Sequence, residues 1–379
     1  MAGRSQNLPR LRPLEPIFGA TLAALVSCGS AVATPAPDAY ATRLEPVYRR
    51  IQGWVDRGYY SGAALMVAQG DHVIGERYFG NYGPDTEVYL ASAGKWLAAA
   101  TIAAVVDDGR VSWGDPAAKW LPELSGAKGR ATLRQLLSHT AGYPDYQPAG
   151  RPRDTYQSLA ESVAHIVPLP AEAEPGAQFH YGGLAMQVAG RMAELATGKD
   201  WEALFQDKIA RPLGMTSTHF TPVDTGEGHA PMLGGGARSN LRDYARFLEM
   251  IAHDGVFRGR RVLSAAAIQE MESDQVRRAQ VDPEREFVGR VRGATHRGVY
   301  GLGEWREQID AHETAVLLSS PSWAGAYPWI DKTCGVWGFF LTHVDTAAAA
   351  RTGFNAFYSS PELAMLVREA VQPTDHKNP

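Results

Sequence analysis

The apolar positions change their spacing along the chain, and they predict sheet at both ends and helices in the middle. Asp38–Gly53 carries apolar residues at helical spacing. Gly62–Ala68 and His72–Phe79 are short apolar runs joined by a turn signal, as in adjacent strands. A later apolar run predicts a helix that ends at Gly109. Strand character returns near the other end, at Gly298–Trp305, Thr314–Ser319, Ala326–Ile330 and Val336–Val344, before a closing helix at Pro361–Val371.

The long middle of the chain has helical spacing instead. From Thr132 to about Glu270 strand signals are few. Leu184, Val188, Met192 and Leu195 form one apolar stripe on a helix that stops at Gly198. Further helices are expected at Leu133–Ser138, Trp201–Ala210 and Leu241–Ile251, and the charged stretch 273–293 is typical of a surface loop.

This order of elements predicts an α/β (α+β) fold, with a mainly antiparallel sheet flanked by helices. Tight turns between the late strands favour antiparallel pairing. We expect a single domain over residues 38–372, with an α/β lobe built from 38–110 and 295–372. A helical lobe, about 111–294, is inserted between those two portions, and 373–379 is a polar tail.

Composition narrows the class of protein. The chain has 379 residues and a formal net charge of -4, and no run of basic residues alternates with aromatic ones. Nucleic-acid binding is therefore not expected. The two cysteines are Cys28 and Cys334, so the processed chain offers no intramolecular disulfide.

Residues 1–37 have the pattern of an export signal. A basic start precedes an apolar run, Ile17–Val26, that is too short to remain as a membrane-spanning helix. Two endings compete: Ala31–Ala33 is an A-x-A cleavage site, and Leu25–Cys28 resembles the lipobox of bacterial lipoproteins. We expect a periplasmic or secreted protein, with membrane anchoring only through a lipid on Cys28.

Ser92 and Lys95 are the first candidates for chemistry. Residues three apart share a helix face, so Lys95 can point its amine towards the Ser92 hydroxyl. The N-terminus of a helix suits a serine near which negative charge develops. A desolvated lysine can be neutral enough to accept the serine proton. The plain alternative is a serine N-cap beside a solvated lysine.

The wider set of motifs resembles serine hydrolases of the β-lactamase and penicillin-binding-protein fold, closest to class C β-lactamases and the esterases that share their fold. The resemblance covers roughly Leu44 to Val371. Its markers, in order, are Ser92–Lys95, Leu136–Gly142, Phe179–Gly183, Pro212–Met215 and Tyr300–Gly303.

The resemblance assigns Tyr181 to the second catalytic motif, Y-x-N. A phenol near a lysine can act as general base towards the serine and later as acid towards the leaving group. Gly183 stands where the family has asparagine, which would help hold the lysine and contact a substrate amide. The departure puts amide and β-lactam substrates in doubt.

The third motif, K-T-G or H-x-G, is also altered. Lys332-Thr333 lies in a predicted turn and is set aside, which leaves Ser320–Ser322 or Trp323–Gly325. The second is favoured, because some related esterases carry W-x-G there. The N–H of Ala326 would then complete an oxyanion hole with that of Ser92; in the other register Trp323 would supply it. Neither offers a cation for a substrate carboxylate.

Several other residues are assigned by position. Trp323 is a pocket wall or a core aromatic, and Tyr143 and Tyr146 are candidates for the substrate mouth. His139 and His180 are expected to be structural hydrogen-bonders. Gly234–Gly236 is expected to form a loop at the pocket rim. No G-x-S-x-G or H-E-x-x-H motif is present, and no metal or organic cofactor is expected.

These observations predict an exported serine hydrolase that forms an acyl-enzyme on small ester, or amide, substrates. The first alternative is a D,D-peptidase or β-lactamase acting on cell-wall peptides or antibiotics. The second is an inert binding protein of the same fold. The sequence does not indicate an oligomeric state.

Overall fold

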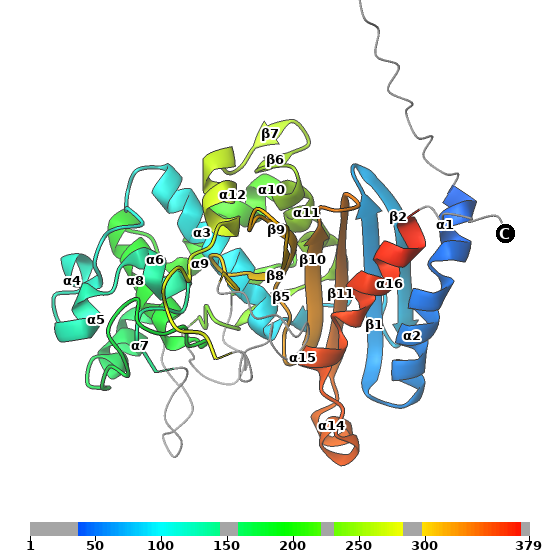
Figure 1. Cartoon of the computed structure of the whole chain (residues 1–379), viewed down its shortest axis with the longest axis horizontal. Helices are drawn as coiled ribbons and strands as arrows, with labels where there is room; N and C mark the ends of the chain where they lie inside the picture. Colours follow the sequence, from blue (N-terminus) through cyan, green and yellow to red (C-terminus); the bar gives the residue numbers. More distant parts are fainter. Residues whose placement is uncertain (1–36, 145–157, 221–230, 283–297, 373–379) are drawn as a thin grey trace, which may run out of the picture. The chain divides into compact units, whose positions relative to one another are not determined.

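A six-stranded antiparallel sheet joins the two ends of the chain. In this computed structural model the described residues are 37–144, 158–220, 231–282 and 298–372. The sheet order is β2-β1-β11-β10-β9-β8, so the N-terminal hairpin pairs with the last strand (Figure 1). Its strands are β1 (Tyr60–Gln69), β2 (His72–Gly80), β8 (Trp305–Ile309), β9 (Ala315–Ser319), β10 (Gly325–Asp331) and β11 (Val336–Val344). The predicted antiparallel sheet is confirmed.

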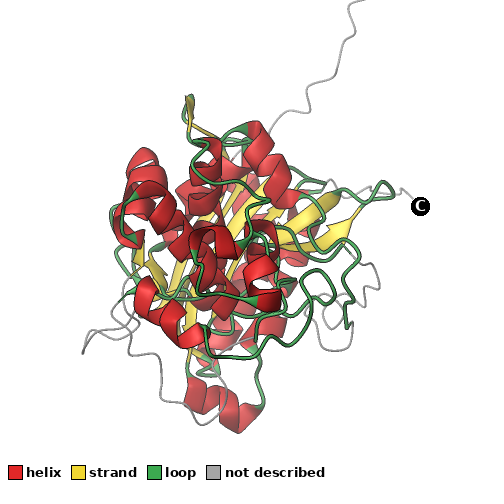
Figure 2. Ribbon diagram, turned by 90° about the vertical axis from the view of Figure 1, so that its left-hand side faces the viewer, coloured by secondary structure: helices red, strands yellow, loops and turns green. Residues whose placement is uncertain are grey.

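Helices cover both faces of the sheet, and the side chains along each strand alternate between these two faces. On β1, Leu65 and Val67 pack with the terminal helices α1 (Pro37–Arg43), α2 (Glu45–Asp56) and α16 (Glu362–Val371). Ala64 and Met66 join the opposite core, which also contains residues of α3 (Gly94–Asp107), α8 (Leu184–Thr197) and α11 (Leu241–Ala252). The result is a sheet between two helical layers, and Figure 2 shows helices standing in front of the strands.

Most of the elements between β2 and β8 are short. The helices are α4 (Ala117–Trp120), α5 (Gly126–Arg130), α6 (Leu133–Leu137), α7 (Leu159–Ile166), α9 (Trp201–Phe205), α10 (Arg211–Leu213) and α12 (Ala265–Glu272), with a π-helical turn η2 (Gln206–Ala210). The strands β3 (Val88–Tyr89), β4 (His219–Phe220) and β5 (Ala237–Ser239) form a small sheet, and β6 (Val256–Phe257) pairs with β7 (Arg260–Arg261). Near the C-terminal end lie α14 (Thr346–Thr352) and α15 (Ala356–Ser359).

Two predictions about elements are wrong. Strand β8 begins at Trp305, not at Gly298, because the residues before it form a turn, in which the Gly301 N–H donates to the Glu304 carbonyl at 3.0 Å. Gly303 there has φ +81°, and a Cβ atom on it would lie 2.6 Å from the carbonyl oxygen of Lys95. Leu195 is 39% exposed: the buried face of α8 is centred on residues such as Ala189 and Met192, and Leu195 lies at its edge in the last turn.

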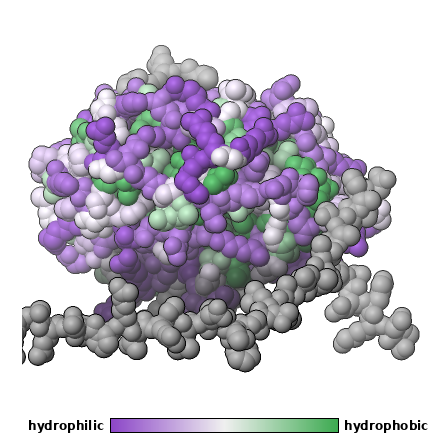
Figure 3. Space-filling view, turned by 90° about the horizontal axis from the view of Figure 1, so that it is seen from above, coloured by the Kyte–Doolittle hydropathy of each residue, from purple (hydrophilic) through white to green (hydrophobic). Residues whose placement is uncertain are grey.

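Some sequence predictions lie outside the described residues. They include nearly all of the predicted export signal with Cys28, the polar tail, and Tyr146. Within the described ranges, no helix is long and apolar enough to cross a membrane. The face drawn in Figure 3 is largely hydrophilic, with apolar residues in separate spots.

Candidate active site

Ser92 lies in a tight turn that leads into α3. The turn, η1 (Ala91–Ala93), is a short 3₁₀ helix, and α3 follows it directly at Gly94. Ala91 has φ +48°, in the left-handed region that alanine seldom adopts. The Leu90 N–H donates to the Ala237 carbonyl at 2.8 Å, which ties the turn to β5. The serine is thus held by its backbone neighbours at the start of a buried helix.

Lys95 is fully buried one helical turn further along. Its Nζ donates to the Ser92 Oγ at 3.1 Å and to the Gly234 carbonyl at 2.5 Å. Burial disfavours the ammonium form and lowers the pKa of Lys95 to about 7. Near neutral pH a large share of the molecules therefore carry a neutral amine that can accept a proton from Ser92.

Tyr181 covers the other side of the lysine. The Nζ of Lys95 lies 4.6 Å from the centre of the Tyr181 ring, over its face. That ring also packs on His139 at 4.7 Å and on Trp305 at 5.1 Å between ring centres. The structure therefore brings the three predicted catalytic side chains Ser92, Lys95 and Tyr181 to one place.

His139 organises the segment that carries Tyr181. Its Nδ1 accepts from the Gly182 N–H at 3.4 Å, and its carbonyl accepts from the His180 N–H at 2.8 Å. Burial holds the pKa of His139 well below its usual value, so the ring is neutral. With Nδ1 as acceptor, Nε2 carries the proton and donates to the Tyr300 hydroxyl at 3.3 Å. The role of His139 is therefore to hold the backbone of the segment that carries Tyr181.

The altered third motif forms a tight turn between β9 and β10. The Ser322 carbonyl accepts from the Gly325 N–H at 3.0 Å, and the Ser322 N–H donates to the Ala326 carbonyl at 2.9 Å. One residue therefore faces two, and Gly325 has φ +104°, as in a glycine β-bulge. Ala326 has no registered partner on β11.

The two candidate registers occupy different parts of this hairpin. The Ser320 Oγ donates to the Ser92 carbonyl at 3.1 Å and lies 3.3 Å from the Gly303 carbonyl, so it holds the hairpin against the turn that carries Ser92. Trp323 stands at the tip and is 49% exposed, beside Tyr89. It is not a core aromatic. Lys332 lies in the turn after β10 and pairs with Glu272, away from these contacts.

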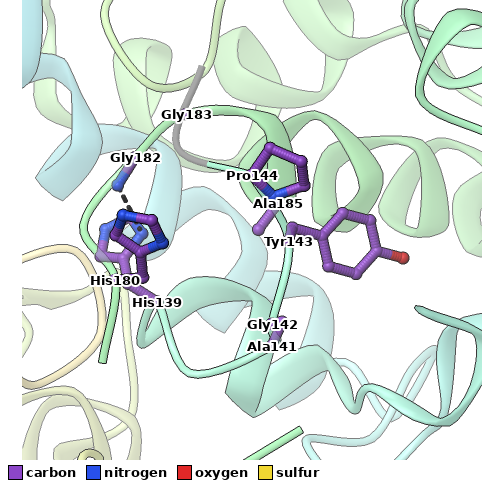
Figure 4. A pocket seen from close by; sticks show the side chains of 9 residues that line it. All are labelled: His139, Ala141, Gly142, Tyr143, Pro144, His180, Gly182, Gly183 and Ala185. Atoms are coloured by element: carbon purple, nitrogen blue, oxygen red, sulfur yellow. Dashed lines mark hydrogen bonds between the residues drawn. The ribbon is translucent and has the colours of Figure 1, made fainter. Parts of the chain in front are cut away.

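A small pocket opens beside the Tyr181 segment. It is lined by His139, Ala141, Gly142, Tyr143, Pro144, His180, Gly182, Gly183 and Ala185 (Figure 4). The Tyr143 ring points away from the two histidines (Figure 4), and its hydroxyl donates to the Lys128 carbonyl at 3.0 Å. Tyr143 therefore lines the pocket without presenting its hydroxyl there.

Sequence reasoning missed three contributors. The carbonyl of Gly234 accepts a hydrogen bond from Lys95, and the hydroxyl of Ser320 donates to the Ser92 carbonyl. Ala91 adopts a strained backbone conformation just before the serine. The glycine cluster at 234–236 was the one available signal, because such clusters permit close backbone approach. In the described part of the chain, no group of three or more metal-binding side chains is found.

Comparison with known proteins shows the family. The β-lactamase family model matches residues 47–355, which is most of the chain. The crystal structure of a candidate β-lactamase from Bacteroides dorei DSM 17855 is 52% identical, with a TM-score of 0.82, over 86% of this chain and 98% of that chain.

Two curated relatives have names that describe activities. The D-alanyl-D-alanine-carboxypeptidase/endopeptidase AmpH of Escherichia coli (strain K12) is 30% identical over 43% of this chain and 46% of its own length. The esterase EstB of Burkholderia gladioli is 28% identical over 48% of this chain and 45% of its own. The chain thus spans about half the length of these curated relatives. From the family model and the 52% identical structure, the chain belongs to the β-lactamase family of serine hydrolases.

Proposed function

We propose that this protein is a serine hydrolase that cleaves small esters through an acyl-enzyme on Ser92. The observation that carries the proposal is the 3.1 Å contact between the Ser92 hydroxyl and the fully buried amine of Lys95. Because the pKa of Lys95 is lowered to about 7, that amine can take the proton as the serine attacks. A lysine with its ordinary pKa would be protonated near neutral pH and could not accept the serine proton.

We assign the steps of ester hydrolysis to the side chains and backbone groups of this site. The Ser92 Oγ bonds to the carbonyl carbon while its proton moves to Lys95. Tyr181 is the proposed second group that accepts and returns protons. The N–H groups of Ser92 and Ala326 are the proposed oxyanion donors, and the register shift between β10 and β11 at Ala326, which has no paired residue on β11, supports that assignment. The intermediate expels an alcohol, which takes a proton back. Water then attacks the acyl-enzyme and releases the acid.

Two departures from the family pattern support esters over amides. Gly183 provides no side-chain amide where the family has asparagine, and neither register of the third motif, at Ser320 or Trp323, carries a cation. A substrate amide or carboxylate would lack those partners. Esters need less help, because an alcohol leaves more readily than an amine.

A peptidase or β-lactamase activity is the second candidate, favoured by the match to AmpH. Turnover of a short-chain nitrophenyl ester should exceed that of a chromogenic cephalosporin. Fast cephalosporin hydrolysis without esterase activity would overturn the ester assignment.

Covalent labelling tests the proposed role of Ser92 as the nucleophile. A fluorophosphonate probe should label the protein at Ser92, and Ser92→Ala should abolish the label. Absence of labelling in a folded wild-type protein would instead support an inert binding protein.

We also propose export, on the pattern of residues 1–37. Mass spectrometry of the processed N-terminus distinguishes the two endings. A chain that begins just after Ala33 indicates A-x-A cleavage, and a lipid on an N-terminal Cys28 indicates a lipoprotein. An unprocessed N-terminus would contradict both.

A further inference from the structure

Gln187 is a buried glutamine on α8 that binds a loop rather than its own helix. Its side chain is only 2% exposed. The Nε2 group donates to the Pro231 carbonyl at 3.1 Å and to the Ser162 hydroxyl at 3.2 Å, while Oε1 accepts from the Leu233 N–H at 2.8 Å. One amide therefore holds the backbone on both sides of Met232.

The loop that Gln187 holds delivers a carbonyl to the lysine. The Gly235 N–H donates to the Met232 carbonyl at 3.0 Å, which closes a tight turn over residues 232–236. The Gly234 carbonyl then accepts from the Lys95 Nζ at 2.5 Å. A Cβ atom on Gly234 would lie 3.0 Å from the Gly183 Cα, so the two glycine segments meet backbone to backbone beside the lysine.

We infer that Gln187 is the positioning residue of Lys95: its amide places the Gly234 carbonyl, and that carbonyl holds the lysine amine on Ser92. The inference rests on the proposed function, in which Lys95 receives the serine proton.

The other contacts of the lysine explain why this carbonyl matters. In the described structure Lys95 bonds to the Ser92 hydroxyl and stacks on the Tyr181 ring, and burial alone accounts for its lowered pKa. Gly183 has no side chain to contribute an acceptor. A hydrogen bond from an ammonium to a carbonyl is stronger than one from a neutral amine, so the Gly234 carbonyl favours the protonated lysine. Loosening it should misplace the amine and also lower its pKa.

Gln187→Met tests the inference, because methionine is of similar length but has no amide. The measurement is the second-order rate of fluorophosphonate labelling of the full chain between pH 5 and 9. We expect the rate to fall by about tenfold to a hundredfold, as small misplacements of catalytic groups do. We also expect the acidic limb of the profile to move to lower pH.

Gly234→Ala reaches the same carbonyl by another route. Its Cβ must push the 232–236 turn away from Gly183, so it should slow labelling and move the acidic limb in the same direction. If Gln187→Met does not fold, as judged by circular dichroism, the labelling rate and acidic limb of Gly234→Ala test the inference in its place.

Gln206→Met is the matched control. Gln206 also uses its amide to bind other groups, donating to the Glu202 carboxylate at 2.8 Å and to the Thr218 carbonyl at 3.0 Å, but it does not contact the 232–236 turn. This variant should keep the wild-type labelling rate and acidic limb. The inference is overturned if Gln187→Met is less stable yet labels with the wild-type rate and profile. A folded wild type that is not labelled at Ser92 overturns the proposed function and this inference together.

Discussion

Replacing Lys95 by methionine removes the buried amine and should make the stability difference between the two proteins depend on pH. In the unfolded chain the lysine pKa is near 10.5, and in the folded protein burial lowers it to about 7. Below pH 7 both states hold the proton, and the folded state bears the full cost of a buried ammonium. Above pH 7 the folded state releases its proton while the unfolded state keeps it. Wild-type stability must therefore rise with pH between 7 and 10.5.

The size of the effect follows from the same two pKa values. The full cost of the buried ammonium is about 5 kcal/mol, and it falls by about 3 kcal/mol between pH 6 and pH 9. Lys95→Met has no such group. The hydrogen bonds it loses to Ser92 and Gly234 change the absolute difference, and any dependence of those bonds on the charge of Lys95 is already contained in the folded-state pKa. Burial, the largest cause of the low pKa of His139, is common to both proteins, and only the smaller contribution from the charge of Lys95 is lost in Lys95→Met.

Urea unfolding at pH 6, 7, 8 and 9 measures the effect. The free energy of unfolding of wild type, minus that of Lys95→Met, should rise by about 3 kcal/mol across the series. Lys119→Met is the control, because it removes a lysine that is exposed and paired with Asp115. Its difference from wild type should stay flat. A flat difference for Lys95→Met as well would show that the lysine pKa is not lowered, and its assignment as base would fail.

Three further substitutions test other parts of the fold. Glu304 is fully buried and burial raises its pKa well above the usual value, so Glu304→Gln should remove a loss of stability that wild type suffers as pH rises above 4.5; a gain in Tm that does not grow between pH 5 and 8 would contradict this. Ser320→Ala removes the side-chain donor to the Ser92 carbonyl, so we expect slower fluorophosphonate labelling and a loss of about 1 kcal/mol in urea unfolding, and an unchanged labelling rate would refute its positioning role. Lys128 donates to three carbonyls at the end of α7 and just beyond it, so Lys128→Met should cost about 1–3 kcal/mol in urea unfolding and leave labelling of Ser92 unchanged, whereas wild-type stability would show those bonds to be dispensable.

The sequence predicts the central sheet better than the region between β2 and β8. Strands such as β1 and β11 are nine or ten residues long and carry dense apolar runs, so their pattern stands out. The strands β3, β4 and β5 have only two or three residues each, too few for any period to show. The run at 298–305 is apolar because Val299, Tyr300 and Trp305 pack in a cluster with Phe179, and burial of that kind looks the same as a strand in sequence.

The candidate site could likewise be predicted only in part from the sequence. Ser92 and Lys95 could be paired from sequence because helical spacing places residues three apart on one face. The acceptor on the lysine could not, because a backbone carbonyl has no residue type that marks it. Gln187 was hidden for a related reason: its partners, at Pro231 and Leu233, are backbone atoms 44 and 46 residues away.

The pairing of β1 with β11 has a consequence for how the chain reaches its native state. The Thr342 hydroxyl donates to the Gly62 carbonyl across 280 residues of sequence, and it lies in that strand pair. Contacts of such long range form late and slow folding. Until β11 arrives, β1 has an open edge able to pair with another chain. A polypeptide that ends before residue 336 would contain both Ser92 and Ser320 but would leave the edges of β1 and β10 unpaired, so aggregation rather than partial activity is the expected fate of such a fragment.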